Sequence, residues 1–310
     1  MRPLHRIALL PVAAGLLVVL AAAFTAPGPE RAQAFFVVIE AVKLASLVGC
    51  AVAAATFDRG DYMRWAWGLN AACFGLLLAR DATLTAGSAS LPLVRGVLVS
   101  AANASSVAGT FLLARALSVA GLTLGGSALA RGAAVVGAVL LSIAITGGAF
   151  VLDVRALLGG DLVAIVAIAS DLGDTLSLAL LAPVLLSAVA MRGGSLVWPW
   201  SLLGAGLFAW LVYDAAAPLA VVGGVDPTRL ELFREVLRAL ACAFVLSGAL
   251  AHRAIVKGLT DDLGSGHVRW GRHREGAVAD HVLAVLDELV RPAEVRLGGA
   301  LEHEAERVEA

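Results

Sequence analysis

The fold is decided by the stretch Arg192-Gly193-Gly194-Ser195-Leu196-Val197-Trp198-Pro199-Trp200 and the apolar segment that follows it to Asp214. A counterpart stands earlier in the chain, with Arg59-Gly60, then Trp65-Ala66-Trp67, then Asp81. One offset, 192 − 59 = 133 residues, relates the arginines, both tryptophan pairs and the two aspartates. A shared spacing across a loop, an aromatic pair and a carboxylate within an apolar run indicates an internal duplication.

The composition is typical of a membrane protein. Of the 310 residues, 60% are hydrophobic and 15% are charged, and the mean hydropathy is +0.88. Several apolar runs each reach the ~20 residues needed to cross the core of a lipid bilayer. They lie near 5–26, 32–57, 64–86, 91–118, 129–153, 161–190, 196–222 and 229–256. We therefore predict an all-α integral membrane protein with about eight transmembrane helices.

The duplication divides these helices into two parallel repeats of four, residues 1–126 and 127–257. Glu40 and Lys43 of the second run correspond to Asp171 and Asp174 of the sixth. Arg95 of the fourth run corresponds to Arg234 of the eighth through the similar segments 91–98 and 230–237. Four helices repeated once keep their orientation, so we expect the repeats to be related by an axis along the membrane normal, as in parallel-repeat transporters.

Basic residues set the expected orientation. They are more frequent in the segments that a cytoplasmic N-terminus places inside, for instance at Arg2, Arg59 and Arg192. We expect a multi-pass protein of the inner (plasma) membrane with both termini in the cytoplasm. The first apolar run resembles a signal peptide, but Pro27 follows its best cleavage site. The second repeat also supplies a counterpart from Arg131 to Phe150, so we expect the first helix to be retained.

Residues 258–310 have a different character. They are expected to form a cytoplasmic linker, a short amphipathic helix from about 275 to 290 and an acidic tail. The apolar face of that helix fits a membrane surface or a cytoplasmic protein partner, and a plain solvated tail is the alternative. The segment is too short to be a catalytic domain with its own core.

Ionisable residues inside the predicted spans are the candidate functional site. Such residues are costly in a membrane and normally face the protein interior or water. Counted at ~1.5 Å per residue from the span ends, most of them fall in the outer half of the bundle. The candidate ligand- or ion-binding residues are Glu40, Lys43, Arg80, Asp81, Arg95, Asp171, Asp174, Asp214, Arg234, Glu235 and Arg238.

The pair Asp171 and Asp174 is the sharpest feature of this set. A spacing of three places both carboxylates on one face of a helix. Two like charges at that distance in a low dielectric require a proton, a bound cation or a basic partner. Lys43 of the first repeat is a candidate partner across the pseudo-axis, although Lys43 and Glu40 are most simply an ion pair within one helix. Alternatively, the acids pair with Arg80, Arg95 or Arg234 only to hold helices together.

Other chemistry is not expected from this sequence. The net charge of −1 gives no indication of a nucleic-acid partner. His5 and His252 lie at span ends, so we expect no haem or catalytic zinc. No predicted span offers a Ser/His or Cys/His pair, so we expect no other cofactor and no enzymatic activity. An enzyme that uses only Asp, Arg and Lys is the alternative. Four tryptophans at predicted helix starts are typical of an interfacial aromatic belt, namely Trp65, Trp67, Trp198 and Trp200. The cysteines fall in apolar runs and are expected to be buried small hydrophobes, at Cys50, Cys73 and Cys242.

The segment from Gly173 to Leu186 resembles part of the MASE-type bacterial membrane sensor domains. Its Gly173-Asp174 is followed by Pro183 in an apolar helix, as in that family. The resemblance implies a multi-helix sensor domain that usually precedes a cytoplasmic kinase or cyclase domain.

Two functions follow from these observations. The first is a carrier for a small solute, a proton or another cation, with the charged site at the repeat interface. The second is a non-enzymatic sensor or scaffold that binds an extracytoplasmic ligand and signals to a separate cytoplasmic partner. A duplicated bundle with so short a cytoplasmic segment favours the carrier.

Overall fold

The structure is a computed structural model of the chain, and it describes residues 2–83, 91–119, 127–161, 164–190 and 197–264. In these ranges the chain forms nine helices and no strand. The helices are α1 (Arg2–Ala8), α2 (Leu10–Phe24), α3 (Pro29–Ala54), α4 (Tyr62–Ala82), α5 (Leu91–Val119), α6 (Ala128–Leu158), α7 (Ala164–Ala190), α8 (Val197–Gly223) and α9 (Pro227–Gly264). The expectation of an all-α fold is confirmed.

Six segments are long and apolar enough to cross a membrane, judged by length and composition over the described residues. They are Leu4–Phe24, Pro29–Ala54, Val94–Ala116, Ala128–Leu158, Ala164–Leu186 and Pro227–Gly258. Helices α4 and α8 are not among the six. Each of these two helices carries an ionisable side chain into the interior of the bundle, Asp81 on α4 and Asp214 on α8.

The first apolar run does not form one continuous helix, because α1 and α2 are separated at Leu9. Pro11 has no amide hydrogen, so it cannot donate the helical hydrogen bond to the carbonyl oxygen of Ile7. The hydroxyl of Ser247 on α9 donates to that carbonyl oxygen instead, at 3.1 Å. The break in the helix is thus compensated by a contact with a distant part of the chain.

The last helix is longer than the sequence predicted. It does not end near residue 256 but continues to Gly264, into the segment expected to be a linker. The predicted amphipathic helix at 275–290 lies outside the described residues.

Local sequence explains where several helices begin and turn. Asp61 caps α4 by accepting a hydrogen bond from the Met63 amide at 2.7 Å, and Ser127 caps α6 through Ala130 at 3.2 Å. Gly28 has a φ of 121°, a conformation that glycine adopts readily, and it lets the chain reverse between α2 and α3.

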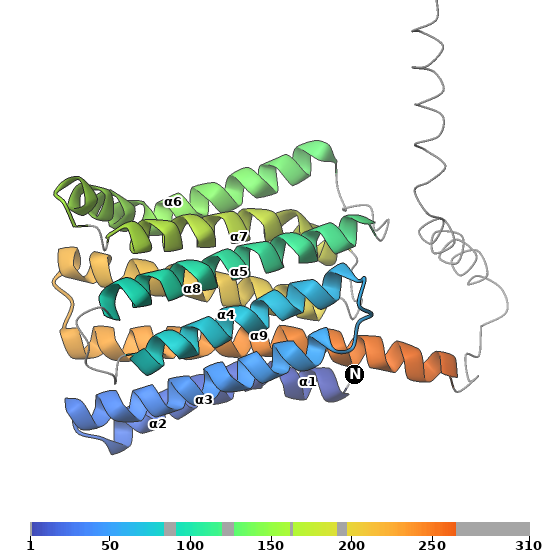
Figure 1. Cartoon of the computed structure of the whole chain (residues 1–310), viewed down its shortest axis with the longest axis horizontal. Coiled ribbons are helices and arrows are strands. Elements are labelled where there is room, and N and C mark those ends of the chain that lie inside the picture. The colour runs from blue at the N-terminus through green and yellow to red at the C-terminus, as the bar shows by residue number, and fades with distance from the viewer. Residues whose placement is uncertain (1, 84–90, 120–126, 162–163, 191–196, 265–310) are drawn as a thin grey trace, which may run out of the picture.

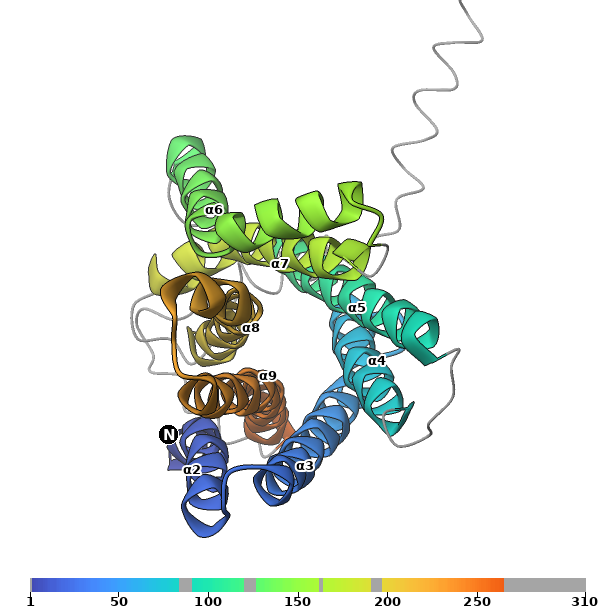
Figure 2. The same ribbon diagram turned by 90° about the vertical axis from the view of Figure 1, so that its left-hand side faces the viewer.

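Six helices form a closed ring in the order α3, α4, α5, α7, α8, α9, and α9 returns to α3. Figure 2 shows this ring end-on, with α2 and α6 lying outside it. Helix α2 packs against α3 and α9, whereas α6 packs against α7 and α8. The helices run roughly along one direction, and α9 extends beyond the others (Figure 1).

The surface of the bundle is apolar and its interior is partly polar. The outer helices expose large apolar side chains, such as Leu16 on α2 and Ile143 on α6. Buried side chains meanwhile include Lys43, Asp81 and Asp171. An apolar exterior around buried charges fits a lipid environment, in which only the interior can solvate ionised groups.

The expected aromatic belt is wrong for two of its four tryptophans. Trp65 and Trp198 are 62% and 36% exposed, as interfacial residues would be. Trp67 and Trp200 are only 1% and 2% exposed and belong to the core of the ring. Successive residues of a helix are rotated by about 100°, so two positions that are two residues apart face different sides of the helix. One tryptophan of each pair therefore faces outward while the other packs inward.

Glycines bring neighbouring ring helices into close contact. A Cβ atom at Gly206 of α8 would lie 3.0 Å from Val245 and 3.1 Å from the Ala241 carbonyl oxygen of α9. A Cβ at Gly109 of α5 would lie 3.0 Å from the Ala66 carbonyl oxygen of α4. Small residues let helix backbones approach closely, and such contacts are an important source of packing energy in membranes.

We expect Gly206→Leu to destabilise the bundle, because the added side chain has to push α8 away from the α9 backbone. Overpacking of this kind costs roughly 1–3 kcal/mol. The matched control is Gly137→Leu on α6, where a Cβ meets nothing within 4 Å. Thermal unfolding of the detergent-purified protein measures the effect. Equal midpoints for the two variants would show that the α8–α9 contact is not tight.

Candidate functional site

A cavity of about 100 Å³ lies inside the ring, and all six ring helices contribute to its wall. Since one water needs roughly 10–15 Å³ of such space, it has room for several waters or a small ion. Its polar lining residues are Lys43, Asn70, Arg80, Asn103, Ser106, Ser170, Asp174, Tyr213, Asp214 and Arg238. The cavity therefore gathers charged residues from both halves of the sequence.

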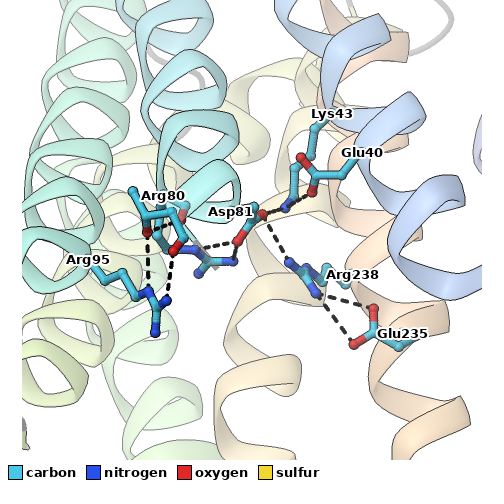
Figure 3. Close-up of polar contacts among 8 residues, drawn as sticks. Glu40, Lys43, Arg80, Asp81, Arg95, Glu235 and Arg238 are labelled. Atoms are coloured by element: carbon cyan, nitrogen blue, oxygen red, sulfur yellow. Dashed lines mark hydrogen bonds and ion pairs between the residues drawn. The ribbon is translucent and has the colours of Figure 1, made fainter. Parts of the chain in front are cut away.

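One side of the cavity is a compensated cluster of charges centred on Asp81 of α4. Lys43 of α3 forms salt bridges with Asp81 and with Glu40, the latter at 2.7 Å. Arg238 of α9 reaches Asp81 at 3.3 Å and Glu235 at 3.3 Å. Arg80 completes the set by pairing with its neighbour Asp81. Figure 3 shows Lys43, Arg80 and Arg238 reaching the Asp81 carboxylate from three helices.

This cluster is electrically balanced. Three cations, Lys43, Arg80 and Arg238, are joined by salt bridges to three carboxylates, Glu40, Asp81 and Glu235. Lys43 and Asp81 are both fully buried. Buried charges persist only when they are paired, and here each has at least one partner of opposite sign.

The predicted pairing of Lys43 with the acids of α7 is therefore wrong. Lys43 instead contacts Glu40, one turn earlier on its own helix, and Asp81 on the adjacent helix α4. The Glu40–Lys43 ion pair expected from the spacing of three is confirmed.

Arg95 of α5 has different partners. Its guanidinium donates hydrogen bonds to the Thr83 hydroxyl at 3.1 Å and to the Thr83 carbonyl oxygen at 2.8 Å. These contacts hold α5 against the end of α4 (Figure 3). Arg95 is not among the residues that line the cavity.

The opposite side of the cavity is a cluster of carboxyl groups. The side chains of Asp174 on α7 and Asp214 on α8 are within hydrogen-bonding reach of each other. Ser170 donates a hydrogen bond to Asp214 at 2.8 Å. Asp171 is only 5% exposed, lies near Asp214, and has one carboxyl oxygen without a hydrogen-bond partner.

Positive charge near these carboxyl groups is limited. Arg234 and Arg80 lie close enough to Asp214 to interact with it electrostatically. However, none of the salt bridges found in the described part of the chain includes Asp171, Asp174 or Asp214. Arg234 instead stacks over the Tyr213 ring, with its guanidinium carbon 4.6 Å from the ring centroid. A hydrogen bond between two carboxyl groups needs a proton, because two carboxylates offer only acceptors.

Aromatic residues pack together inside the bundle at the end where α4 and α8 begin, which we call the Trp67 end. Trp67 donates a hydrogen bond from Nε1 to His252 Nδ1 at 3.1 Å. Phe57 and Trp200 lie 5.2 and 6.0 Å from the same imidazole, measured between ring centroids. Trp67 and Trp200 thus pack on one histidine of α9.

Several cavity residues carry no charge and were missed in the sequence. They include Asn70, Asn103, Ser106, Ser170 and Tyr213. A usable signal exists on α4, where Asn70, Cys73, Leu77 and Arg80 recur at helical spacing along one face. Following that face back from Arg80 would have identified Asn70. Within the described residues, no group of three or more His, Cys, Asp or Glu side chains is arranged to hold a metal ion.

Comparison of the chain with protein-family models, curated proteins and solved structures gives no significant match. The resemblance of residues 173–186 to MASE-type sensor domains therefore gains no support from a family model. The geometry of the cavity is the remaining guide to function.

We expect Lys43→Met to destabilise the protein strongly, because it leaves Asp81 and Glu40 with one cation fewer in the interior. Breaking a buried pair in this way costs roughly 3–5 kcal/mol. The double variant Lys43→Met/Asp81→Asn keeps the cluster neutral and should recover much of the loss. Denaturant unfolding in detergent measures both.

The control for this pair is Arg59→Met, which removes an exposed charge from the loop before α4. Its free energy of unfolding should equal that of the unmodified protein. If the double variant is less stable than Lys43→Met, the Lys43–Asp81 contact is not what holds α3 to α4.

Proposed function

We propose that this chain is a membrane carrier that moves protons, or a small cation in exchange for them, through the central cavity. The proposal includes eight spans with both termini in the cytoplasm, α1 and α2 together forming the first. It also includes two parallel repeats, in which α3, α4 and α5 correspond to α7, α8 and α9. The bound proton or cation lies between Asp174 and Asp214.

The ring order supports the repeat. The neighbouring pairs α3–α4, α4–α5 and α5–α7 have the counterparts α7–α8, α8–α9 and α9–α3, and all six pairs are in contact. This is the order that a pseudo-twofold axis through the cavity generates. The outer helices depart from it, because α2 contacts α9 whereas α6 contacts α8.

One observation carries the functional proposal. In the first repeat Lys43 of α3 forms a salt bridge with Asp81 of α4. At the corresponding positions of the second repeat, Asp174 of α7 meets Asp214 of α8. The ammonium group of one half is therefore replaced by a second carboxyl group in the other. A mobile cation at this point restores the charge balance that Lys43 supplies permanently in the first repeat.

Charge and size both support a proton. Asp171, Asp174 and Asp214 outnumber the nearby cations Arg234 and Arg80, so this carboxyl cluster has negative charge in excess when all are ionised. A cavity of about 100 Å³ is smaller than the roughly 300–1,000 Å³ of typical small-molecule pockets. A proton relayed by waters and carboxyl groups fits this space, as in known proton relays through membranes.

A ligand-sensing role is the second candidate, and the buried aromatic cluster at the Trp67 end favours it. The cavity residues nearest that end are Asn70 and Val245, and the buried cluster of Trp67, Trp200 and His252 lies beyond them. Helix α9 passes this cluster and continues to Gly264. A ligand that shifts α9 at the cavity would thereby also move the last turns of α9, which lie beyond the Trp67 end.

We expect Asp174→Asn and Asp214→Asn to abolish proton flux, because an amide cannot exchange a proton at this site. Losing a proton-transfer group typically slows such a step by roughly 100-fold or more. Flux is measured in proteoliposomes that contain a pH-sensitive dye, with a potassium diffusion potential as the driving force. Glu231→Gln is the matched control, since Glu231 lies on α9 but does not line the cavity.

Asp174→Lys separates loss of function from loss of folding. It places an ammonium group beside Asp214, as Lys43 stands beside Asp81, so we expect a folded protein with an unfolding midpoint no lower than that of Asp174→Asn. Its proton flux should be as low as that of protein-free liposomes. Unchanged flux in Asp174→Lys would contradict the carrier. Absence of flux in the unmodified protein would favour the sensor.

A further inference from the structure

A second hollow lies on the outside of the bundle, away from the charged cavity. It is a groove of about 420 Å³ between α6, α8 and the start of α9. Its floor is formed by small residues of α8, Ala215, Ala216 and Ala220, the first and last of which are buried. Ile145 of α6 and Phe233 of α9 stand on its two sides. The groove is thus apolar along almost all of its length.

One end of the groove carries a positive charge. Among the described residues that line the groove, Arg229 in the first turn of α9 is the charged one, and it is exposed. Asp226 is already engaged as the cap of α9, because its carboxylate accepts a hydrogen bond from the Arg229 amide at 2.9 Å. In the described residues, no salt bridge includes the Arg229 guanidinium. A helix start is itself positive, so an arginine there lacks the complementary charge that it would find at a helix end.

The dimensions of the groove match one leaflet of a bilayer. From Val212 to Ala220 it follows α8 for about 12 Å, at ~1.5 Å per residue. Half of a hydrocarbon core of ~30 Å is about 15 Å. Arg229 and Val225 lie beyond the end of α8, whereas Ile145 and Val212 lie near the middle of their helices. An occupant therefore meets a charge at the membrane surface and only apolar contacts toward the midplane.

We propose that this groove binds an anionic glycerophospholipid, with an acyl chain over Ala216 and Ala220 and the phosphate group at Arg229. Charge complementarity selects this occupant, because the apolar length alone would accept any acyl chain. An apolar helix face of a second copy would leave Arg229 without an acceptor. Basic residues beside grooves between membrane helices bind anionic headgroups in this manner.

The test uses the full chain purified in mild detergent and supplied with equal amounts of phosphatidylglycerol and phosphatidylcholine. Native mass spectrometry then measures which lipid is retained. We expect the unmodified protein to favour phosphatidylglycerol, and Arg229→Gln to lower that preference by about fivefold. Arg155→Gln is the matched control, since Arg155 is also exposed, lies near the end of α6 on the same side, and does not line the groove.

A second variant tests the apolar part. Ala216→Trp fills the groove, so it should lower the retention of both lipids. In the unmodified protein, a phosphatidylglycerol with a photoreactive acyl chain should label peptides of α6, α8 and α9. Equal retention of the two lipids, or equal effects of Arg229→Gln and Arg155→Gln, would overturn the proposal. So would a dimer that Ala216→Trp dissociates, because the groove would then hold a second copy.

Discussion

The salt bridge between Lys43 and Asp81 is the contact on which the interior of this bundle depends. Neither side chain reaches solvent, and an isolated charge in such a place would be costly by several kcal/mol. Asp81 forms salt bridges with three cations, Lys43 of α3, Arg80 of α4 itself and Arg238 of α9. Because the opposite charges come from different helices, the balance exists only when these helices are assembled. The same charges that oppose burial therefore specify which helices stand together.

In the proposed repeat, the two halves of the ring place different side chains at corresponding positions. Each brings a residue of its first ring helix against an aspartate of the next, Lys43 against Asp81 and Asp174 against Asp214. The first contact contains its own counter-ion and is stable without any ligand. The second is satisfied only with a proton or a bound cation. In the proposed carrier, a half with a fixed cation beside a half with an exchangeable one gives the asymmetry that a site needs if it is to bind and release.

The sequence predicted the helices better than it predicted what each helix faces. Apolar length alone located α5, expected at 91–118 and found at Leu91–Val119. The orientation of Trp67, like the partner of Lys43, could not be predicted in this way, because helix rotation is set by packing. Gly49 is an example, because a Cβ there would collide with Leu246 of α9. That contact joins residues far apart in the chain, so the local sequence of α3 does not reveal which way Gly49 faces. Asn70 escaped notice for another reason, as an uncharged residue costs too little in a membrane to be conspicuous.

The packing also limits which helix can move if the site is to exchange its proton between the two sides. Glycines bring backbone against backbone where α4 meets α5, at Gly109, and where α8 meets α9, at Gly206. The Asp81 cluster joins α3, α4 and α9. Helix α7 differs from them at the described glycines, because Gly96 of α5 and Gly204 of α8 face its side chains and not its backbone. It carries Asp174 and contains Pro183, which cannot donate the helical hydrogen bond and so weakens the helix at that turn. Within the proposed carrier, these contacts favour a movement of α7 against a stationary remainder of the ring.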